Sequence, residues 1–224
     1  MATDQHEPVT WTANGVPISD RFDDPFYSLE DGLAETRHVF IEGNRLPARL
    51  TPGFTVAELG VGTGLNLLAL AELARLKGTA PVRYTGFEAF PLAQGDLAQA
   101  LSAFFPNVPI FAEALLTAWD PAGFSFHAEG VDATMIVGDA RLTVRGWTGA
   151  ADAWFLDGFS PAKNPELWEE DLMHAVAAHT RPGGTFATYT SAGHVRRKLD
   201  KAGFEVTRQP GFARKRHMTT GTLR

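Results

Sequence analysis

Residues 54–66 read FTVAELGVGTGLN, and this stretch decides the fold. Its first part, residues 54–59, is mainly apolar and is typical of a buried strand. Glycine then occupies every second position over residues 60–64, which predicts a tight turn. Leucine and alanine recur at helical spacing over residues 65–77, and Gly78 ends that helix. A buried strand that leads through a glycine turn into a helix predicts the first unit of a parallel α/β sheet.

Further strands and helices alternate after this unit. We expect strands over residues 82–87, 153–156, 185–190 and 204–209, a hairpin of residues 124–128 and 133–137, a last strand over residues 215–219, helices over residues 92–105, 166–179 and 192–202, and a sharp turn at residues 181–184. The alternation predicts an α/β fold with a doubly wound, mostly parallel sheet of the Rossmann-like type. Residues 1–52 carry several turn signals, so we expect an N-terminal extension packed on a domain of residues 53–224.

The composition excludes several classes of protein. The 224 residues suit one α/β domain, and the absence of cysteine excludes disulfides, thiolate catalysis and cysteine-bound metals. The seven histidines are scattered without the spacing of metal ligands, so no metal is expected. No apolar run is long enough to span a membrane, and residues 1–8 lack the apolar core of a signal peptide. We therefore expect no membrane association and a cytoplasmic location.

The charge is distributed unevenly along a chain whose net charge is −6. Residues 193–224 contain nine of the 20 lysines and arginines but only two of the 26 acidic residues. Such a basic end is suited to bind a polyanion, while the acidic remainder repels it. On charge alone, however, a solvated C-terminal helix and hairpin is the favoured interpretation.

The glycine loop of residues 60–64 indicates which cofactor the fold binds. It differs from the dinucleotide fingerprint G-x-G-x-x-G because its third glycine comes one residue early, so no flavin is expected. It also lacks the Gly-Lys-Ser/Thr of a P-loop. A glycine loop without a phosphate-binding lysine, preceded by the acidic Glu58, favours a nucleoside ligand without phosphate, and S-adenosylmethionine is such a ligand.

Three acidic residues follow predicted strands, where α/β folds bind their ligands. Glu88 ends the second strand and is placed to accept hydrogen bonds from ribose hydroxyls. Asp139 follows the strand near residue 137 and is placed to accept a hydrogen bond from an adenine amino group. Glu58 faces the ligand's ammonium group or holds the loop. Each signal alone is also compatible with a structural turn or a helix N-cap, but their joint order favours a nucleoside cofactor.

A second motif, residues 152–168, reads DAWFLDGFSPAKNPELW. Asp157 lies at a predicted strand end, and Phe159 follows it closely. A carboxylate beside an amine can orient the nitrogen and take its proton, which methyl transfer to nitrogen requires. An aromatic ring beside it can stack on a planar base. The alternative is a strand-end turn rich in glycine and proline, but Asp157 should open toward the same cleft as the glycine loop.

On these motifs the chain resembles the tRNA 5-methylaminomethyl-2-thiouridine methyltransferases, which occur alone or as the N-terminal half of a bifunctional enzyme. The matching stretches are residues 22–24, 32–36, 43–47, 58–66, 90–92, 138–140, 152–168, 182–188, 195–197, 202–204, 211–212 and 215–216. The resemblance implies a class I methyltransferase fold. It also implies methyl transfer from S-adenosylmethionine to the primary amine of 5-aminomethyl(-2-thio)uridine at the tRNA wobble position.

The resemblance also implies roles for individual residues. The cofactor residues would be Glu58, Gly60, Gly62, Thr63, Gly64, Asn66, Glu88, Asp139 and Ala140, with Tyr27 beside Phe26 closing over the cofactor. Asp157 would be the catalytic residue for the substrate amine, with Phe159 nearby. For the anticodon region of tRNA, we expect contacts from Lys163, Arg196, Arg197, Lys215 and Arg216.

Partners and alternatives complete the sequence-based expectations. A separate oxidase that acts on the same nucleoside is a possible partner, and no obligate protein partner is inferred. One alternative is an N-methyltransferase or aminopropyl transferase for a small-molecule amine, which would need no basic patch. Another is a binding module of methyltransferase fold without activity, although the presence of Glu58, Glu88, Asp139 and Asp157 argues against it.

Overall fold

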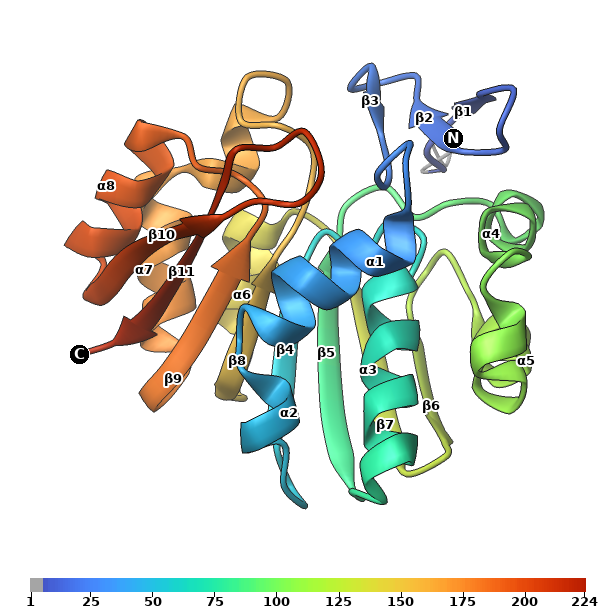
Figure 1. Ribbon diagram of the computed structural model, residues 1–224, viewed down its shortest axis with the longest axis horizontal. Helices are drawn as coiled ribbons and strands as arrows, with labels where there is room; N and C mark the ends of the chain where they lie inside the picture. The colour runs from blue at the N-terminus through green and yellow to red at the C-terminus, as the bar shows by residue number, and fades with distance from the viewer. Residues whose placement is uncertain (1–5) are drawn as a thin grey trace.

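The computed structural model describes residues 6–224, and an eight-stranded sheet lies at its centre (Figure 1). The strand order is β10-β11-β9-β8-β4-β5-β7-β6. The strands are β4 (Thr55–Leu59), β5 (Val82–Glu88), β6 (Phe124–Ala128), β7 (Val131–Val137), β8 (Ala151–Leu156), β9 (Thr180–Thr188), β10 (Phe204–Pro210) and β11 (His217–Leu223). The five strands from β9 to β7 are parallel, whereas β6, β10 and β11 pair antiparallel at the edges. The predicted doubly wound, mostly parallel sheet is confirmed.

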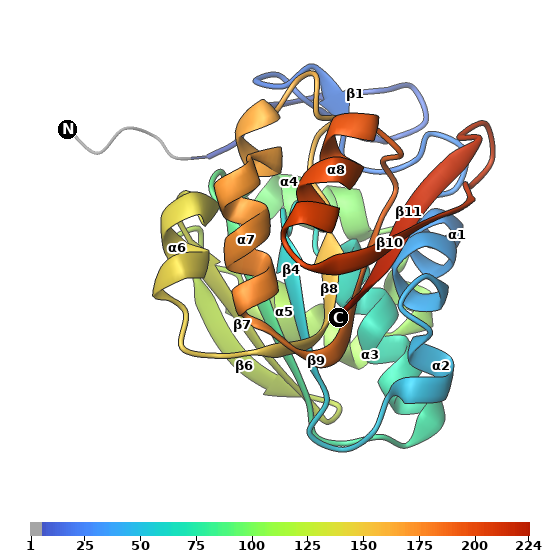
Figure 2. The ribbon, with the colours of Figure 1, turned by 90° about the vertical axis from the view of Figure 1, so that its left-hand side faces the viewer.

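Helices cover both faces of the sheet, as Figure 2 shows for α6, α7 and α8 on one face and α2 and α3 on the other. The helices outside the N-terminal segment are α3 (Leu65–Lys77), α4 (Gln94–Leu101), α5 (Pro109–Ala118), α6 (Ala140–Gly146), α7 (Glu170–Ala178) and α8 (Gly193–Lys201), with short 3₁₀ turns η2 (Phe105–Asn107) and η3 (Pro165–Trp168). Each face has its own apolar core. Val56 of β4 packs into the core with α3 and α5, and its neighbour Ala57 packs into the core with α7 and α8. This alternation follows from the two-residue period of a strand.

Residues 6–52 form short elements beside the sheet. They are β1 (Val9–Trp11), β2 (Pro17–Ser19) and β3 (Asp24–Pro25), which pair as a small antiparallel sheet, followed by α1 (Gly32–Thr36), the π-helical turn η1 (Arg37–Glu42) and α2 (Leu46–Arg49). Helix α1 packs against α3, and Figure 1 shows β1–β3 above one end of the central sheet. This segment therefore lies over the strand ends from which the glycine loop begins.

Several sequence-based boundaries were wrong. The helix predicted over residues 92–105 is α4 alone, and α5 was missed although Pro109 stands in its first turn. The helix predicted over residues 166–179 is divided into η3 and α7. The sharp turn predicted at residues 181–184 is present as an irregularity inside β9, where the register with β8 skips these residues and Gly183 has a φ of 72°.

None of the helices in the described part of the chain is both long enough and apolar enough to cross a bilayer. The expectation for residues 1–8 falls largely on residues 1–5, which lie outside the described residues.

Candidate active site

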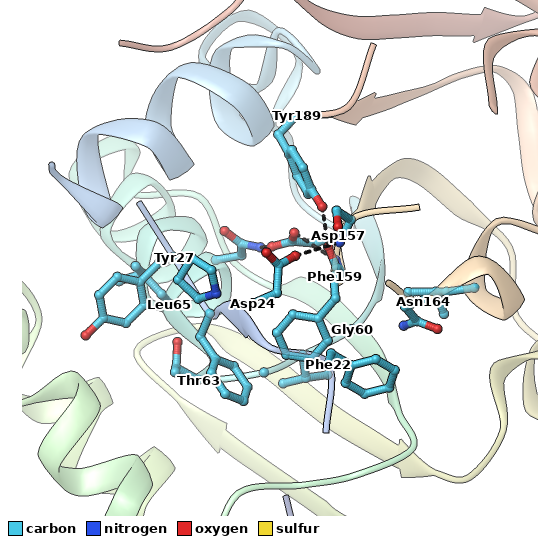
Figure 3. Close-up of a pocket in the computed structure, with 18 of the residues that line it drawn as sticks. Phe22, Asp24, Tyr27, Gly60, Thr63, Leu65, Asp157, Phe159, Asn164 and Tyr189 are labelled. Atoms are coloured by element: carbon cyan, nitrogen blue, oxygen red, sulfur yellow. Dashed lines mark hydrogen bonds between the residues drawn. The ribbon is translucent and has the colours of Figure 1, made fainter. Parts of the chain in front are cut away.

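A cavity of about 1060 Å³ opens at the carboxyl ends of the central strands (Figure 3). Its floor is formed by the loops that follow β4, β5, β7 and β8, where the strand order reverses between β4 and β8. Residues of the N-terminal segment and of the loop between β10 and β11 form the remaining walls. Ligands of doubly wound sheets bind at this switch point, so the fold itself places the cavity where a ligand is expected.

The glycine loop comes very close to its neighbours. Gly60 has a φ of 76°, and a Cβ there would lie 3.0 Å from the backbone oxygen of Asp157. Gly62 has a φ of 53°, and a Cβ there would lie 3.1 Å from the ring of Phe26. Left-handed backbone and crowded surroundings both require glycine at these positions. Gly60 and Gly62 both line the cavity, where a residue without a side chain lets a ligand approach the backbone closely.

Glu88 joins the loop to the end of β5. Its carboxylate accepts hydrogen bonds from the backbone N–H of Gly62 at 2.9 Å and of Phe90 at 2.8 Å. Burial raises the pKa of Glu88, and these backbone N–H donors oppose that shift. Glu88 lines the cavity beside the glycine loop, as the sequence predicts.

Asp139 and Ala140 also line the cavity, at the start of α6. Asp139 is the N-cap of that helix and accepts a hydrogen bond from the backbone N–H of Arg141 at 2.9 Å. The Arg141 side chain pairs with the same carboxylate at 2.7 Å and holds the pKa of Asp139 below its usual range. Asp139 thus already has a structural role, because both of its carboxylate oxygens accept hydrogen bonds from Arg141.

Asp157 follows β8 and reaches the centre of the cavity wall. Its carboxylate accepts hydrogen bonds from the backbone N–H of Gly158 and from the side-chain amide of Asn66, both at 2.8 Å. Removal from bulk water raises the pKa of Asp157 to about 7, and the charge of Glu35 adds to the rise. The two hydrogen bonds and the nearby Lys215 oppose it. A carboxyl group that titrates near neutrality is suited to proton transfer.

Aromatic rings enclose this part of the cavity. Phe159 stacks on Phe22 with ring centres 4.7 Å apart, and Phe26 meets the same ring edge-on at 5.1 Å. Tyr27 lines the cavity and donates its hydroxyl to the backbone oxygen of Ala100 at 3.1 Å. Burial raises the pKa of Tyr27 to about 12. Aromatic rings of the N-terminal segment thus line the same cavity as Asp157.

Glu58 and Gly64, two of the predicted cofactor residues, do not line the cavity. Glu58 is fully buried behind Asn66 and hydrogen-bonds the Tyr84 hydroxyl. Gly64 is the N-cap of α3. Thr63 and Asn66 do line the cavity with Gly60 and Gly62. Glu58 therefore contacts Asn66 and Tyr84 behind the cavity wall, and which of its two expected roles it has stays a prediction.

The predicted RNA contacts divide into two groups. Lys163 pairs with Asp23 at 3.1 Å, and Lys215 pairs with Glu35 at 2.7 Å and lies 4.2 Å above the ring of Tyr189. Lys215 lines the cavity, whereas Lys163 does not. Arg196, Arg197 and Arg216 lie outside the cavity, and none of them has an ion pair within residues 6–224.

Sequence reasoning missed several residues of the cavity wall. Tyr189 donates its hydroxyl to the backbone oxygen of Gly158 at 2.8 Å, and Figure 3 shows that hydroxyl directed toward Asp157. Glu35, Arg141 and Asp24 were likewise assigned no role, although Asp24 accepts a hydrogen bond from the Ser160 backbone N–H at 2.8 Å. The stretches around residues 24 and 35 did match the resembled family, but nothing in their spacing indicates a contact across more than 100 residues.

The cavity fits a nucleoside cofactor together with a second molecule. Its volume reaches the upper end of the range for small-molecule sites. The side-chain-free backbone of Gly60 and Gly62 is open to a ligand, and carboxylates stand at the ends of β5 and β7. No group of His, Cys, Asp or Glu in residues 6–224 has the arrangement of a metal site.

Comparison with protein families places these observations in a known group. Residues 108–224, more than half of the chain, match a family model described as S-adenosyl-L-methionine-dependent methyltransferase. Two curated relatives are called tRNA 5-methylaminomethyl-2-thiouridine biosynthesis bifunctional protein MnmC. The Caulobacter protein is 44% identical over 96% of this chain, and the Marinobacter nauticus protein is 41% identical over 100% of it. The chain spans only 38% of the length of each relative.

Solved structures agree with the fold. The crystal structure of MnmC2 from Aquifex aeolicus superposes with a TM-score of 0.74 at 25% identity, and the match covers 97% of this chain and 70% of that one. A spermidine synthase from Thermotoga maritima matches with a TM-score of 0.59 over 96% of this chain and 71% of its own, but its 11% identity shows the fold alone.

Proposed function

Because the chain belongs to a family of S-adenosyl-L-methionine-dependent methyltransferases, we propose that it methylates the primary amine of 5-aminomethyl(-2-thio)uridine at the wobble position of tRNA. The product would be the 5-methylaminomethyl form of the nucleoside. The observation that carries this proposal is the position of Asp157, a carboxyl group with a pKa of about 7 on the wall of a cavity that also holds the glycine loop. The names of the relatives, which span more than this chain, support the choice of substrate.

The cofactor would lie along the strand ends. Gly60, Gly62 and Thr63 would contact its amino-acid part through their backbone, and Glu88 would accept hydrogen bonds from the ribose. Asp139 and Ala140 would meet the adenine at the start of α6. Tyr27 would close the site from the N-terminal segment. When bound, the cofactor supplies a methyl group on a positively charged sulfur, which is a good leaving group.

Asp157 would act on the acceptor amine. An ammonium group has no lone pair, so the amine must be neutral when it attacks. The nitrogen becomes positively charged when it gains the methyl group, and it is neutral again once it has lost a proton. The ionised carboxylate of Asp157 would orient the amine by a hydrogen bond and receive that proton. Its pKa of about 7 leaves a useful fraction ionised at neutral pH while keeping it basic enough to accept a proton. Orientation within the enclosed site should supply much of the rate gain.

The acceptor base would enter beside Phe159. Its ring is packed against Phe22 and Phe26, so the base would meet a fixed aromatic edge and not a mobile side chain. For the RNA backbone, we propose that Arg196, Arg197 and Arg216 meet phosphates, since they carry no ion pair within residues 6–224. Lys163 and Lys215 would need to leave Asp23 and Glu35 to do the same.

Other parts of the proposal concern the cell and the supply of substrate. We place the reaction in the cytoplasm, where mature tRNA is modified. For the aminomethyl group of the substrate, we propose a separate oxidase that acts on the same nucleoside. This chain should need neither a flavin nor a metal for the methyl transfer itself.

The decisive experiment uses tRNA that carries the unmethylated aminomethyl uridine, incubated with the protein and methyl-labelled S-adenosylmethionine. We expect label in 5-methylaminomethyl uridine after digestion and mass spectrometry. Asp157→Ala should remove this activity, while Asp171→Asn, an exposed carboxylate paired with Arg145, should leave it unchanged. Tight cofactor binding without transfer to tRNA would refute the substrate, and a polyamine or other small amine would then be tested in its place.

A further inference from the structure

The side-chain amide of Asn66 lies between two carboxyl groups. Its nitrogen donates to Asp157 Oδ2 at 2.8 Å and to Glu58 Oε1 at 2.5 Å. Asn66 stands in the first turn of α3 and is 5% exposed, and the two acids lie near the carboxyl ends of the neighbouring strands β4 and β8. One amide group thus joins the fully buried acid to the acid that faces the cavity.

Thr36 contacts the oxygen of this amide. The Thr36 hydroxyl, 4% exposed at the end of α1, donates to Asn66 Oδ1 at 2.8 Å. An asparagine side chain has two N–H donors and one oxygen, and all three positions are used here. If the amide were rotated by 180°, its oxygen would face the two carboxyl groups, and the Thr36 hydroxyl would have to accept from its NH₂. In the observed orientation both N–H groups face acids, and the Thr36 hydroxyl helps to hold it by donating to the amide oxygen.

The charges around the pair favour an anion on Asp157 and a proton on Glu58. Glu58 is fully buried, and burial together with the charge of Asp157 raises its pKa well above the usual value. Its other oxygen hydrogen-bonds the buried Tyr84 hydroxyl. Asp157 instead has the Gly158 backbone N–H and the positive charge of Lys215 near it. Glu35 and Tyr189 also face Asp157, from α1 and from the segment after β9.

We propose that Asn66 is a positioning residue for Asp157. Its amide, oriented by Thr36, holds the Asp157 carboxylate toward the cavity and keeps it ionised, while Glu58 on the other N–H remains neutral. This inference rests on the proposed function for the identity of the amine, but the arrangement concerns the protein alone. It assigns Asn66 a role besides the cofactor contact expected from the sequence, and it assigns Thr36 a role where the sequence gave none.

The experiment compares Thr36→Val with Thr36→Ser. Valine has nearly the shape of threonine without the hydroxyl, and serine restores the hydroxyl. Thr180→Val is the matched control, because Thr180 is also buried, donates to the Val176 backbone oxygen at 2.7 Å and begins β9 at the end of the strand away from the cavity. The titration of Asp157 is followed in each protein by ¹³C NMR of labelled aspartate carboxyl groups, with Asp157→Asn to assign the signal.

We expect the midpoint of Asp157 to rise by about one pH unit in Thr36→Val, equivalent to the loss of one hydrogen bond to the charged form. Thr36→Ser and Thr180→Val should keep the wild-type midpoint. In single-turnover methyl transfer, Thr36→Val should lose about fivefold in rate at pH 7, because the ionised fraction of Asp157 falls by that factor, and should regain part of it at higher pH. The affinity for S-adenosylhomocysteine, measured by calorimetry, should stay within about twofold of wild type because the glycine loop is untouched.

An Asp157 midpoint that is equal in Thr36→Val and Thr180→Val would overturn the proposal. If the midpoint stays constant and only cofactor affinity falls, Asn66 serves the cofactor and not Asp157. If wild-type protein transfers no methyl group to tRNA, the proposed function fails, yet the NMR titration still decides the role of Thr36 and Asn66.

Discussion

Replacing Asp157 with asparagine separates the energetic effect of the buried charge from the shape of the side chain. The pKa of Asp157 rises from the ordinary aspartate value of 3.8 to about 7 in the folded protein. Between these values the folded state retains a proton that the unfolded state has lost, so the stability of the wild type falls as the pH rises. The shift of roughly three units corresponds to on the order of 4 kcal/mol, as an upper limit because water in the cavity screens the charge. Above about pH 7 both states are ionised, and the loss is complete.

Asparagine does not titrate, so the stability of the Asp157→Asn protein relative to wild type should increase with pH. It also has a fixed penalty, because one of the two donors, the Gly158 N–H or the Asn66 amide, would then face an NH₂ group in place of a carboxylate oxygen. That penalty is about 1–3 kcal/mol and does not depend on pH. Of the total titration effect, about 3 kcal/mol should appear between pH 5 and pH 8, which corresponds to a relative change in Tm of roughly 10 °C.

The assay is urea unfolding of both proteins at pH 5, 6, 7 and 8, followed by far-UV circular dichroism. The stability difference between Asp157→Asn and wild type is plotted against pH, so that contributions from Glu58 and Glu88 largely cancel. We expect a difference that moves in favour of the variant up to about pH 7 and then becomes constant. A difference that stays flat over the whole range would show that Asp157 titrates at its ordinary value, and the argument for a near-neutral proton acceptor would be wrong.

Three further predictions follow from contacts at the site. Gly60→Ala should lower stability by about 1–2 kcal/mol and weaken binding of S-adenosylhomocysteine in calorimetry, because the φ of 76° and the 3.0 Å approach to the Asp157 backbone oxygen both oppose a side chain. Unchanged values for both would show that the loop relaxes freely. Lys215→Met should shift the acidic limb of the pH–rate profile upward, because Lys215 lowers the pKa of Asp157, and a downward shift would contradict the assignment. Arg197→Ala and Arg216→Ala should each reduce the slope of log K for tRNA against log salt by about 0.7, while the control Lys201→Ala, which breaks a pair with Glu170, should leave the slope unchanged.

The sequence predicts those parts of the fold that local patterns encode. The strand and glycine turn of residues 54–64 were predicted correctly because a buried strand and a left-handed turn each leave a local signature. Helix α5 was not predicted, because Pro106 and Pro109 interrupt the helical pattern between α4 and the apolar residues of α5. The hairpin of β6 and β7 was predicted because Glu129 and Gly130 mark the turn, and both have positive φ in the structure.

The candidate site was predictable only in part. The residues that follow strand ends, such as Glu88 and Asp157, could be placed because parallel strands bring their carboxyl ends together. The neighbours that decide their chemistry could not, since Thr36 lies 30 residues from Asn66 and Lys215 lies 180 residues from Glu35. The sequence suggested that Lys215 contacts RNA, whereas the structure pairs it with Glu35 within the cavity wall.

The ion pair between Lys215 and Glu35 is consistent with the charges that line the cavity. The cavity wall carries Asp157, Glu35 and Glu88, whose charges would attract the sulfonium of the cofactor and an acceptor amine in the proposed function. Arg196, Arg197 and Arg216, which have no ion pair within residues 6–224, lie outside the cavity and would attract phosphates instead. Cations that line the cavity would repel both reacting groups if their charges were free, but Arg21, Arg141 and Arg214 are each paired with an acid. Lys215 is neutralised in the same way, because it pairs with Glu35 and lies over the ring of Tyr189.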